Sequence, residues 1–81
     1  MGKELLTLAL LPPGCKARVR EIVGGYGLRG RLLELGFVKG TNLRVLKNNR
    51  GPLIISIDGV RLALGRGVAN KILVEPIEGV G

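Results

Sequence analysis

The side chains that could carry out chemistry are few in this chain of 81 residues. It has one cysteine, Cys15, and no histidine. Histidine is the commonest general base and transition-metal ligand, so a histidine-based triad and a tetrahedral zinc site within one chain are excluded. A thiolate at Cys15 with carboxylates could form a weak metal site, especially one shared between chains; the alternative is a buried or half-buried structural thiol. One cysteine also excludes an internal disulfide and is typical of a reducing compartment.

A glycine-rich segment between Gly24 and Gly30 is the second candidate for chemistry. Its residues 25–30 match the pattern GxGxxG. That pattern binds a dinucleotide within a βαβ unit, with an acidic residue about 20 positions further on. Nothing after this segment supplies the parallel strand or that acidic residue. We therefore interpret the glycines as a loop that leads into a helix, with Gly27 as the N-cap.

The positive charge of the chain indicates an anionic partner. The formal net charge is +7, which is typical of proteins that bind nucleic acid when the charges share one face. Here residues 1–40 carry seven basic and three acidic side chains, and residues 41–81 carry six and three. Such a dispersed field suits an anionic membrane leaflet or an acidic protein equally well. Stacking platforms for nucleic acid are scarce, with one tyrosine and one phenylalanine.

A short amphipathic helix is predicted after the glycine loop, because leucines recur there at positions i, i+4 and i+7. The stripe expected in the core comprises Leu28, Leu32 and Leu35, widened by Leu33. Gly36 is expected to end the helix in the left-handed conformation, with Phe37 folding back toward Leu32. A helix this short that also contains Gly30 is not stable alone, so other elements must pack on it.

Alternating apolar residues between glycine turns predict five short strands, over residues 15–23, 42–47, 53–57, 60–64 and 71–75. Asp58-Gly59 predicts a type I′ hairpin turn, and the strand after it is expected to face inward with Val60, Leu62 and Leu64. Pro76 is expected to end the last strand, followed by a frayed tail over residues 77–81. Residues 65–70 are expected to form a turn or a single helical turn.

The expected fold is therefore mainly β: a closed, small SH3-like barrel of about five antiparallel strands, with one short α-helix between the first and second strands. We expect a single domain over residues 1–81, with its core over residues 7–75. An apolar run at residues 5–11 is too short to span a membrane and is interpreted as a first strand or docking arm. No other segment approaches a span, so a cytoplasmic protein is expected.

The order and spacing of these residues resemble the ferrous iron transport protein A family, the FeoA domain, from Thr7 to Glu75. The residues that carry the resemblance are Leu11, Pro13-Gly14, Ala17, Val19, Gly25, Gly27-Leu28, Leu32, Glu34-Leu35-Gly36-Phe37, Gly40-Thr41, Gly51-Pro52, Gly59, Leu62-Ala63-Leu64, Ala69 and Ile72. Lys39 and Gly65-Arg66-Gly67 depart from the usual pattern of the family.

The resemblance implies an SH3-like cytoplasmic accessory protein that docks on the G-protein region of a membrane ferrous iron transporter, and so associates peripherally with the membrane. The same domain type is similar to the C-terminal domain of iron-dependent repressors. By the resemblance, Fe(II) or another transition metal could bind, whereas the residues themselves indicate no tightly bound cofactor and no catalytic site.

Two classes of function follow from the sequence. In the first, the domain is a protein-interaction module, and the expected partner-binding residues are Tyr26, Leu28, Arg29, Arg31, Leu32, Arg61 and Arg66. In the second, it is a basic SH3-like regulatory domain that binds nucleic acid or serves a metal-dependent repressor. An enzyme is not expected, because no nucleophile has an identifiable base.

Overall fold

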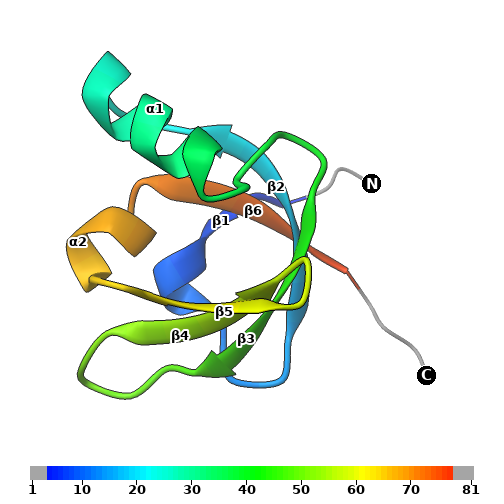
Figure 1. Ribbon diagram of the computed structural model, residues 1–81. Helices are drawn as coiled ribbons and strands as arrows, with labels where there is room; N and C mark the ends of the chain where they lie inside the picture. The colour runs from blue at the N-terminus through cyan, green and yellow to red at the C-terminus, as the bar shows by residue number, and fades with distance from the viewer. Residues whose placement is uncertain (1–3, 78–81) are drawn as a thin grey trace.

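The structure, a computed structural model, describes residues 4–77 of the chain (Figure 1). It consists of short strands and helices in the order β1 (Leu6–Thr7), a 3₁₀ helix η1 (Leu8–Leu10), β2 (Lys16–Ile22), α1 (Tyr26–Glu34), β3 (Asn42–Lys47), β4 (Leu53–Ile57), β5 (Val60–Leu64), α2 (Arg66–Ala69) and β6 (Ile72–Ile77). The mainly β fold with α1 between two strands is as predicted. The N-terminal apolar run adds one strand to the expected five.

All strand pairs are antiparallel, in the order β1-β6-β2-β3-β4-β5. In Figure 1 these strands curve around η1, while α1 lies on the outside of the strands. Within the described residues β1 and β5 are the two ends of this order, so hydrogen bonds do not close the sheet. The expectation that closure removes both edges is therefore wrong.

The core is aliphatic and contains one aromatic ring. Its buried residues are Leu8, Leu11, Ala17, Val19, Leu32, Phe37, Leu43, Val45, Leu53, Ile55, Ile57, Leu64, Ala69, Ile72 and Val74. Seven of them lie at alternate positions of β2, β3 and β4, as the sequence pattern predicts, because successive side chains of a strand point to opposite faces. Cys15 is half-buried and packs against this core.

The stop of α1 has the hydrogen bonds of a Schellman motif. The N–H of Phe37 donates to the carbonyl of Leu32 at 2.9 Å, and that of Gly36 donates to the carbonyl of Leu33 at 3.0 Å. Gly36 has φ +102°, a conformation that favours glycine. The predicted stop is confirmed. The beginning of the helix was predicted incorrectly, because Gly25, not Gly27, is the N-cap.

Leu35 and Val60 are two of the apolar residues whose burial differs from the sequence pattern. Leu35 is 46% exposed because it is the C-cap residue, where the chain leaves the helical path that would carry its side chain inward. Val60 is 55% exposed because it directly follows the Asp58-Gly59 turn, where the edge strand β5 has just begun. The turn itself is confirmed, with φ of 52° and 79° at its two central residues.

Proline does not end the last strand. Pro76 lies within β6 and is opposite Ala17 of β2. The pairing of β6 with β1 on its other side stops at Leu6 and Val74, so no β1 residue lies beside Pro76 to accept the N–H that proline lacks. Ile77 belongs to β6, and the rest of the predicted tail lies outside the described residues.

One asparagine joins three parts of the fold that are distant in sequence. The side-chain amide of Asn48, after β3, donates to the carbonyls of Ala9 at 3.0 Å and Leu11 at 2.6 Å. Its oxygen accepts a hydrogen bond from the guanidinium of Arg66, which also donates to the backbone carbonyl of Asn49. Asn48 therefore holds the N-terminal segment and α2 to the loop between β3 and β4.

We predict opposite effects for two glycine-to-alanine substitutions. Gly36→Ala places a side chain at positive φ and should lower the free energy of unfolding by about 1–2 kcal/mol. Gly30→Ala lies in open space within α1 and should raise it by about 0.5–1 kcal/mol. Urea unfolding of both variants checks the pair. Equal effects of the two substitutions would contradict the Schellman stop.

We also predict that Asn48→Ala lowers the free energy of unfolding by about 1–3 kcal/mol, because it leaves the Ala9 and Leu11 carbonyls without their donor. Asn49→Ala is the matched control. It retains the backbone carbonyl that Arg66 binds and should change stability by less than about 0.5 kcal/mol. Thermal unfolding measures both, and an Asn48→Ala variant as stable as its control would refute this role.

Candidate functional site

A groove of about 290 Å³ lies between α1 and β2. Its lining comes from β2, from α1 and from the turn that follows α1, and comprises Val19, Arg20, Glu21, Ile22, Arg29, Leu33, Phe37 and Lys39. The buried side chains of Val19 and Phe37 form its apolar base. An apolar base with charged residues at its sides is suited to binding a peptide side chain, and nothing in this lining constitutes a nucleophile with a base.

A β-bulge shapes the β2 side of the groove. Val19 is opposite Val74 and Glu21 is opposite Leu73, so Arg20 is the extra residue on β2. The bulge shifts the alternation by one position. Glu21 is consequently exposed and Ile22 packs against the core, although strict alternation from Val19 would give the reverse.

The α1 side of the groove consists of two side chains one helical turn apart. Arg29 and Leu33 are at positions i and i+4 and therefore share a face of α1. Leu33 is 53% exposed, so its apolar surface is available to a partner. The turn after α1 is held against β2, because the N–H of Gly40 donates to the carbonyl of Val19 at 2.7 Å. This hydrogen bond positions Lys39 beside the groove.

The charges around the groove leave it with a modest positive field. Arg20 forms an ion pair with Glu75, with 3.3 Å between its Nη1 and the carboxylate Oε1. Arg29 and Lys39 form no ion pair within residues 4–77, and Glu21 is the one acidic residue of the lining. Two uncompensated cations against one carboxylate favour a partner that carries negative charge.

The structure distributes the predicted partner-binding residues of α1 over different environments. Arg29 lines the groove, whereas Leu32 is buried in the core. Tyr26, the first residue of α1, is 91% exposed. Arg31 is exposed and lies outside the groove lining. Leu28 is half-buried against the core.

The expected partner-binding residues Tyr26 and Leu28 therefore lie outside the groove lining. The Cδ2 of Leu28 lies 2.8 Å from where a Cβ on Gly24 would be, so Leu28 packs directly on the glycine loop. The accessible apolar side chain that lines the groove on α1 is Leu33, five residues after Leu28. The other two predicted residues are elsewhere: Arg61 is exposed on β5, and Arg66 of α2 is bound to Asn48.

Sequence reasoning missed Glu21, Leu33 and Lys39 as lining residues. Leu33 was assigned to the core stripe because it is next to Leu32 in an apolar run. The one available signal was its i+4 spacing from Arg29, which places the two on one face of the helix. Lys39 and Glu21 gave no such signal, because a turn hydrogen bond and a bulge bring them to the groove.

A set of exposed apolar side chains lies on α1 and in the segments directly before and after it, in addition to the groove. It consists of Val23, Tyr26, Leu33, Leu35 and Val38, each at least 46% exposed. Grouped exposed apolar residues indicate a surface that binds another molecule. Together with the groove, this set makes the α1 side of the molecule the candidate functional site.

The structure identifies no metal centre in the part of the chain that it describes. Residues 4–77 contain no group of three or more His, Cys, Asp and Glu side chains placed to hold an ion. No helix within the same range is both long and apolar enough to cross a bilayer.

Comparisons with known proteins identify the family and the fold of this chain. A family described as the FeoA domain matches residues 6–76. The chain is 42% identical over 71 residues to the "Putative Fe(2+) transport protein A" of Methanocaldococcus jannaschii, covering 88% of this chain and 87% of that protein. A crystal structure of an iron uptake regulatory protein (FeoA) superposes with a TM-score of 0.87 at 36% identity, covering 91% of this chain and all of the other.

Two further solved structures relate the fold to known domains. Stenotrophomonas maltophilia FeoA complexed with zinc, described as a procaryotic SH3 domain protein, has a TM-score of 0.76 at 31% identity and covers 85% of this chain and 88% of its own. A manganese-dependent transcriptional repressor has a TM-score of 0.85 at 21% identity, over 95% of this chain and 44% of the repressor. The likeness to the repressor concerns the fold alone. The SH3-like fold and the resemblance to repressors are thereby confirmed.

Proposed function

Because this chain belongs to the FeoA domain family, we propose that it is an accessory protein of ferrous iron uptake that acts by binding a partner protein. The partner is the cytoplasmic G-protein region of a membrane ferrous iron transporter, and the chain acts in the cytoplasm, at the membrane surface. Its influence on transport is exerted through this contact and involves no reaction at its own residues. Ferrous iron is the cargo of the transporter in this proposal.

The α1–β2 groove is the observation that supports this proposal most strongly. Its base is apolar, Leu33 is accessible beside it, and Arg29 and Lys39 carry uncompensated charge. The complementary partner segment has one apolar side chain that enters the groove and carboxylates on either side of it. Such an arrangement places apolar burial at the centre of the interface and charges at its rim, where they steer association.

A binding titration with two groove variants tests this surface. Against the G-protein region of the transporter from the same cells, Leu33→Ser and Arg29→Glu should each raise Kd about tenfold or more. Leu33→Ser removes an apolar contact of the groove, and Arg29→Glu sets a carboxylate at the rim against the carboxylates of the partner. Arg50→Glu has the same charge change as Arg29→Glu in the β3–β4 loop, away from the groove, and should change Kd less than about threefold. Calorimetry measures all three.

The possible results of this titration test the proposed partner and the proposed binding surface separately. Saturable binding that no groove variant weakens would leave the partner intact and refute the α1–β2 groove as its site. Absence of binding to the G-protein region, in the presence and absence of nucleotide, would refute the partner itself. Circular dichroism confirms that the variants remain folded, which is expected because Arg29 and Leu33 are exposed.

An electrophoretic mobility titration across salt concentrations distinguishes the regulatory, nucleic-acid-binding alternative. Phosphate contacts make nucleic-acid affinity fall steeply as salt rises. We expect no shift of RNA or DNA at physiological salt, because the exposed Tyr26 is the one ring available for stacking in the described structure. A specific complex that persists there would favour the alternative.

A further inference from the structure

Three cations and a hydroxyl form a row across the outer face of the sheet. Of the four strands that carry these side chains, only β2 also lines the α1–β2 groove. Lys16 of β2 is opposite Arg44 of β3, Arg44 is opposite Ser56 of β4, and Ser56 is opposite Arg61 of β5. Directly opposite residues share a face, so the four side chains project from the same side of the sheet. Their inward neighbours, Ala17, Leu43, Val45 and Ile57, are buried, which fixes this side as the outer one.

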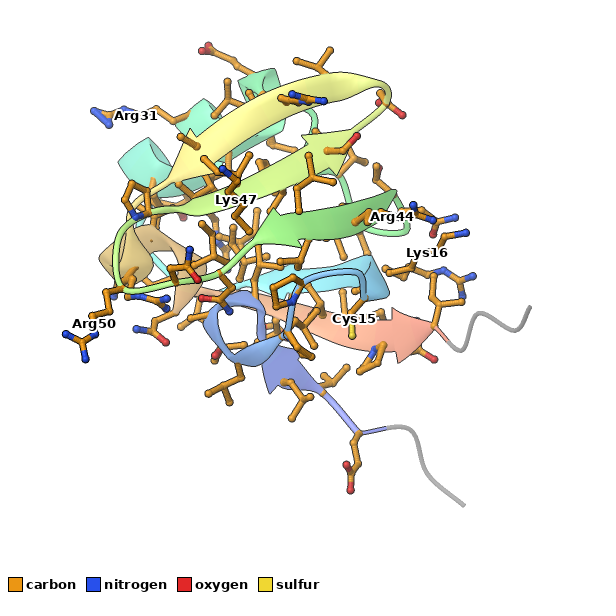
Figure 2. All side chains as sticks on the ribbon, turned by 90° about the horizontal axis from the view of Figure 1, so that it is seen from below. Cys15, Lys16, Arg31, Arg44, Lys47 and Arg50 are labelled. Carbon is orange, nitrogen blue, oxygen red and sulfur yellow. The ribbon has the colours of Figure 1, made fainter. Side chains whose placement is uncertain are left out.

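The centre of this row is a shallow hollow of about 250 Å³, lined by Lys16, Asn42, Leu43, Arg44 and Ser56. We infer that this hollow is a binding site for a phosphate group. Its side chains stand on three hydrogen-bonded strands rather than on loops, so their spacing is set by the sheet. Figure 2 shows Lys16 and Arg44 together, on the opposite side of the view from Arg31 and Arg50.

The pairing of Lys16 with Arg44 carries an electrostatic cost that a bound anion would relieve. Like charges directly opposite each other on adjacent strands destabilise a sheet. Neither side chain forms an ion pair within residues 4–77, and neither does Arg61. The nearest carboxylate in the register, Glu75, is opposite Arg18 and forms its ion pair with Arg20. Asp58 lies beyond the row, in the β4–β5 turn. Within residues 4–77, ion pairs therefore leave this charge uncompensated.

The donor set is suited to phosphate rather than to a carboxylate. A phosphate monoester carries a charge of about −1.5 to −2 at neutral pH and has three acceptor oxygens, so it can use two or three cations at once. Arg44 offers a planar fork of donors, Lys16 a mobile point charge, and Ser56 and Asn42 neutral donors. A single carboxylate would neutralise one of these cations and would leave the positive charge of the others uncompensated.

Recognition at this site involves the phosphate and not a base attached to it. The lining contains no aromatic ring, and the one tyrosine is on α1. Without a stacking surface, a nucleobase would add little to binding. The phosphate could belong to a soluble phosphate ester or to a lipid headgroup. The open shape of the hollow admits both.

The test measures phosphate binding by the full chain directly. We expect inorganic phosphate to shift the backbone amide NMR signals of Lys16, Arg44 and Ser56 saturably, relative to sodium chloride at matched ionic strength. Arg44→Gln and Lys16→Gln should each weaken binding about tenfold, because each removes a charged hydrogen-bond donor. Arg50→Gln removes an exposed cation from the β3–β4 loop and should change affinity less than about twofold, because it lies outside the hollow.

Sedimentation with phosphatidylcholine vesicles, with and without phosphatidic acid, identifies the source of the phosphate. The site is assigned to a lipid headgroup if vesicles with phosphatidic acid capture the protein, Arg44→Gln abolishes this capture and Arg50→Gln preserves it. Saturable binding of inorganic phosphate without vesicle capture assigns it to a soluble ester. Absence of binding in both assays, or equal weakening by Arg44→Gln and Arg50→Gln, would overturn the site. Since Lys16 and Arg44 are outside the groove lining, neither result affects the proposed docking of a partner protein.

Discussion

The attachment of α1 to the sheet depends on two buried side chains, Leu32 and Phe37. Leu32 is the buried residue within the helix itself, and Phe37 is the largest side chain that is fully buried. The Schellman stop holds them together, since the N–H of Phe37 binds the carbonyl of Leu32. Nine residues are too few for a helix to be stable in water, so α1 exists because this contact secures it. The groove between α1 and β2 exists for the same reason.

A small aliphatic core explains why the molecule has two distinct outer surfaces. The curved sheet encloses its apolar residues, but α1 contributes little to that core and keeps Leu33, Leu35 and neighbouring apolar side chains exposed. One surface is therefore apolar with cations at its rim. The other is the outer face of β2–β5, where Lys16 and Arg44 occupy positions that alternate with buried ones. The former favours a protein segment, and the latter favours an anion.

Much of the fold could be predicted from the sequence because its signals are local. Alternation identified five of the six strands to within two residues, Asp58-Gly59 identified the hairpin, and Gly36 identified the end of α1. The errors occur where a neighbour distant in sequence decides the outcome. Pro76 fits within β6 because β1 has already ended beside it. The sequence of neither strand alone indicates where β1 ends relative to Pro76. Likewise, the sequence gives no sign that Asn48 binds Ala9 and Leu11, which lie 39 and 37 positions away.

By itself the sequence determined the types of element, the aliphatic character of the core, the family resemblance and the lack of histidine chemistry, because composition and periodicity act between near neighbours. The tertiary structure alone decided which faces meet. It placed Glu21 and Lys39 beside Arg29, and it placed Lys16 opposite Arg44. Strand register and a bulge set these positions, and register depends on many contacts between residues that are far apart in the chain. The residues next to a given position in the sequence therefore do not reveal its strand register.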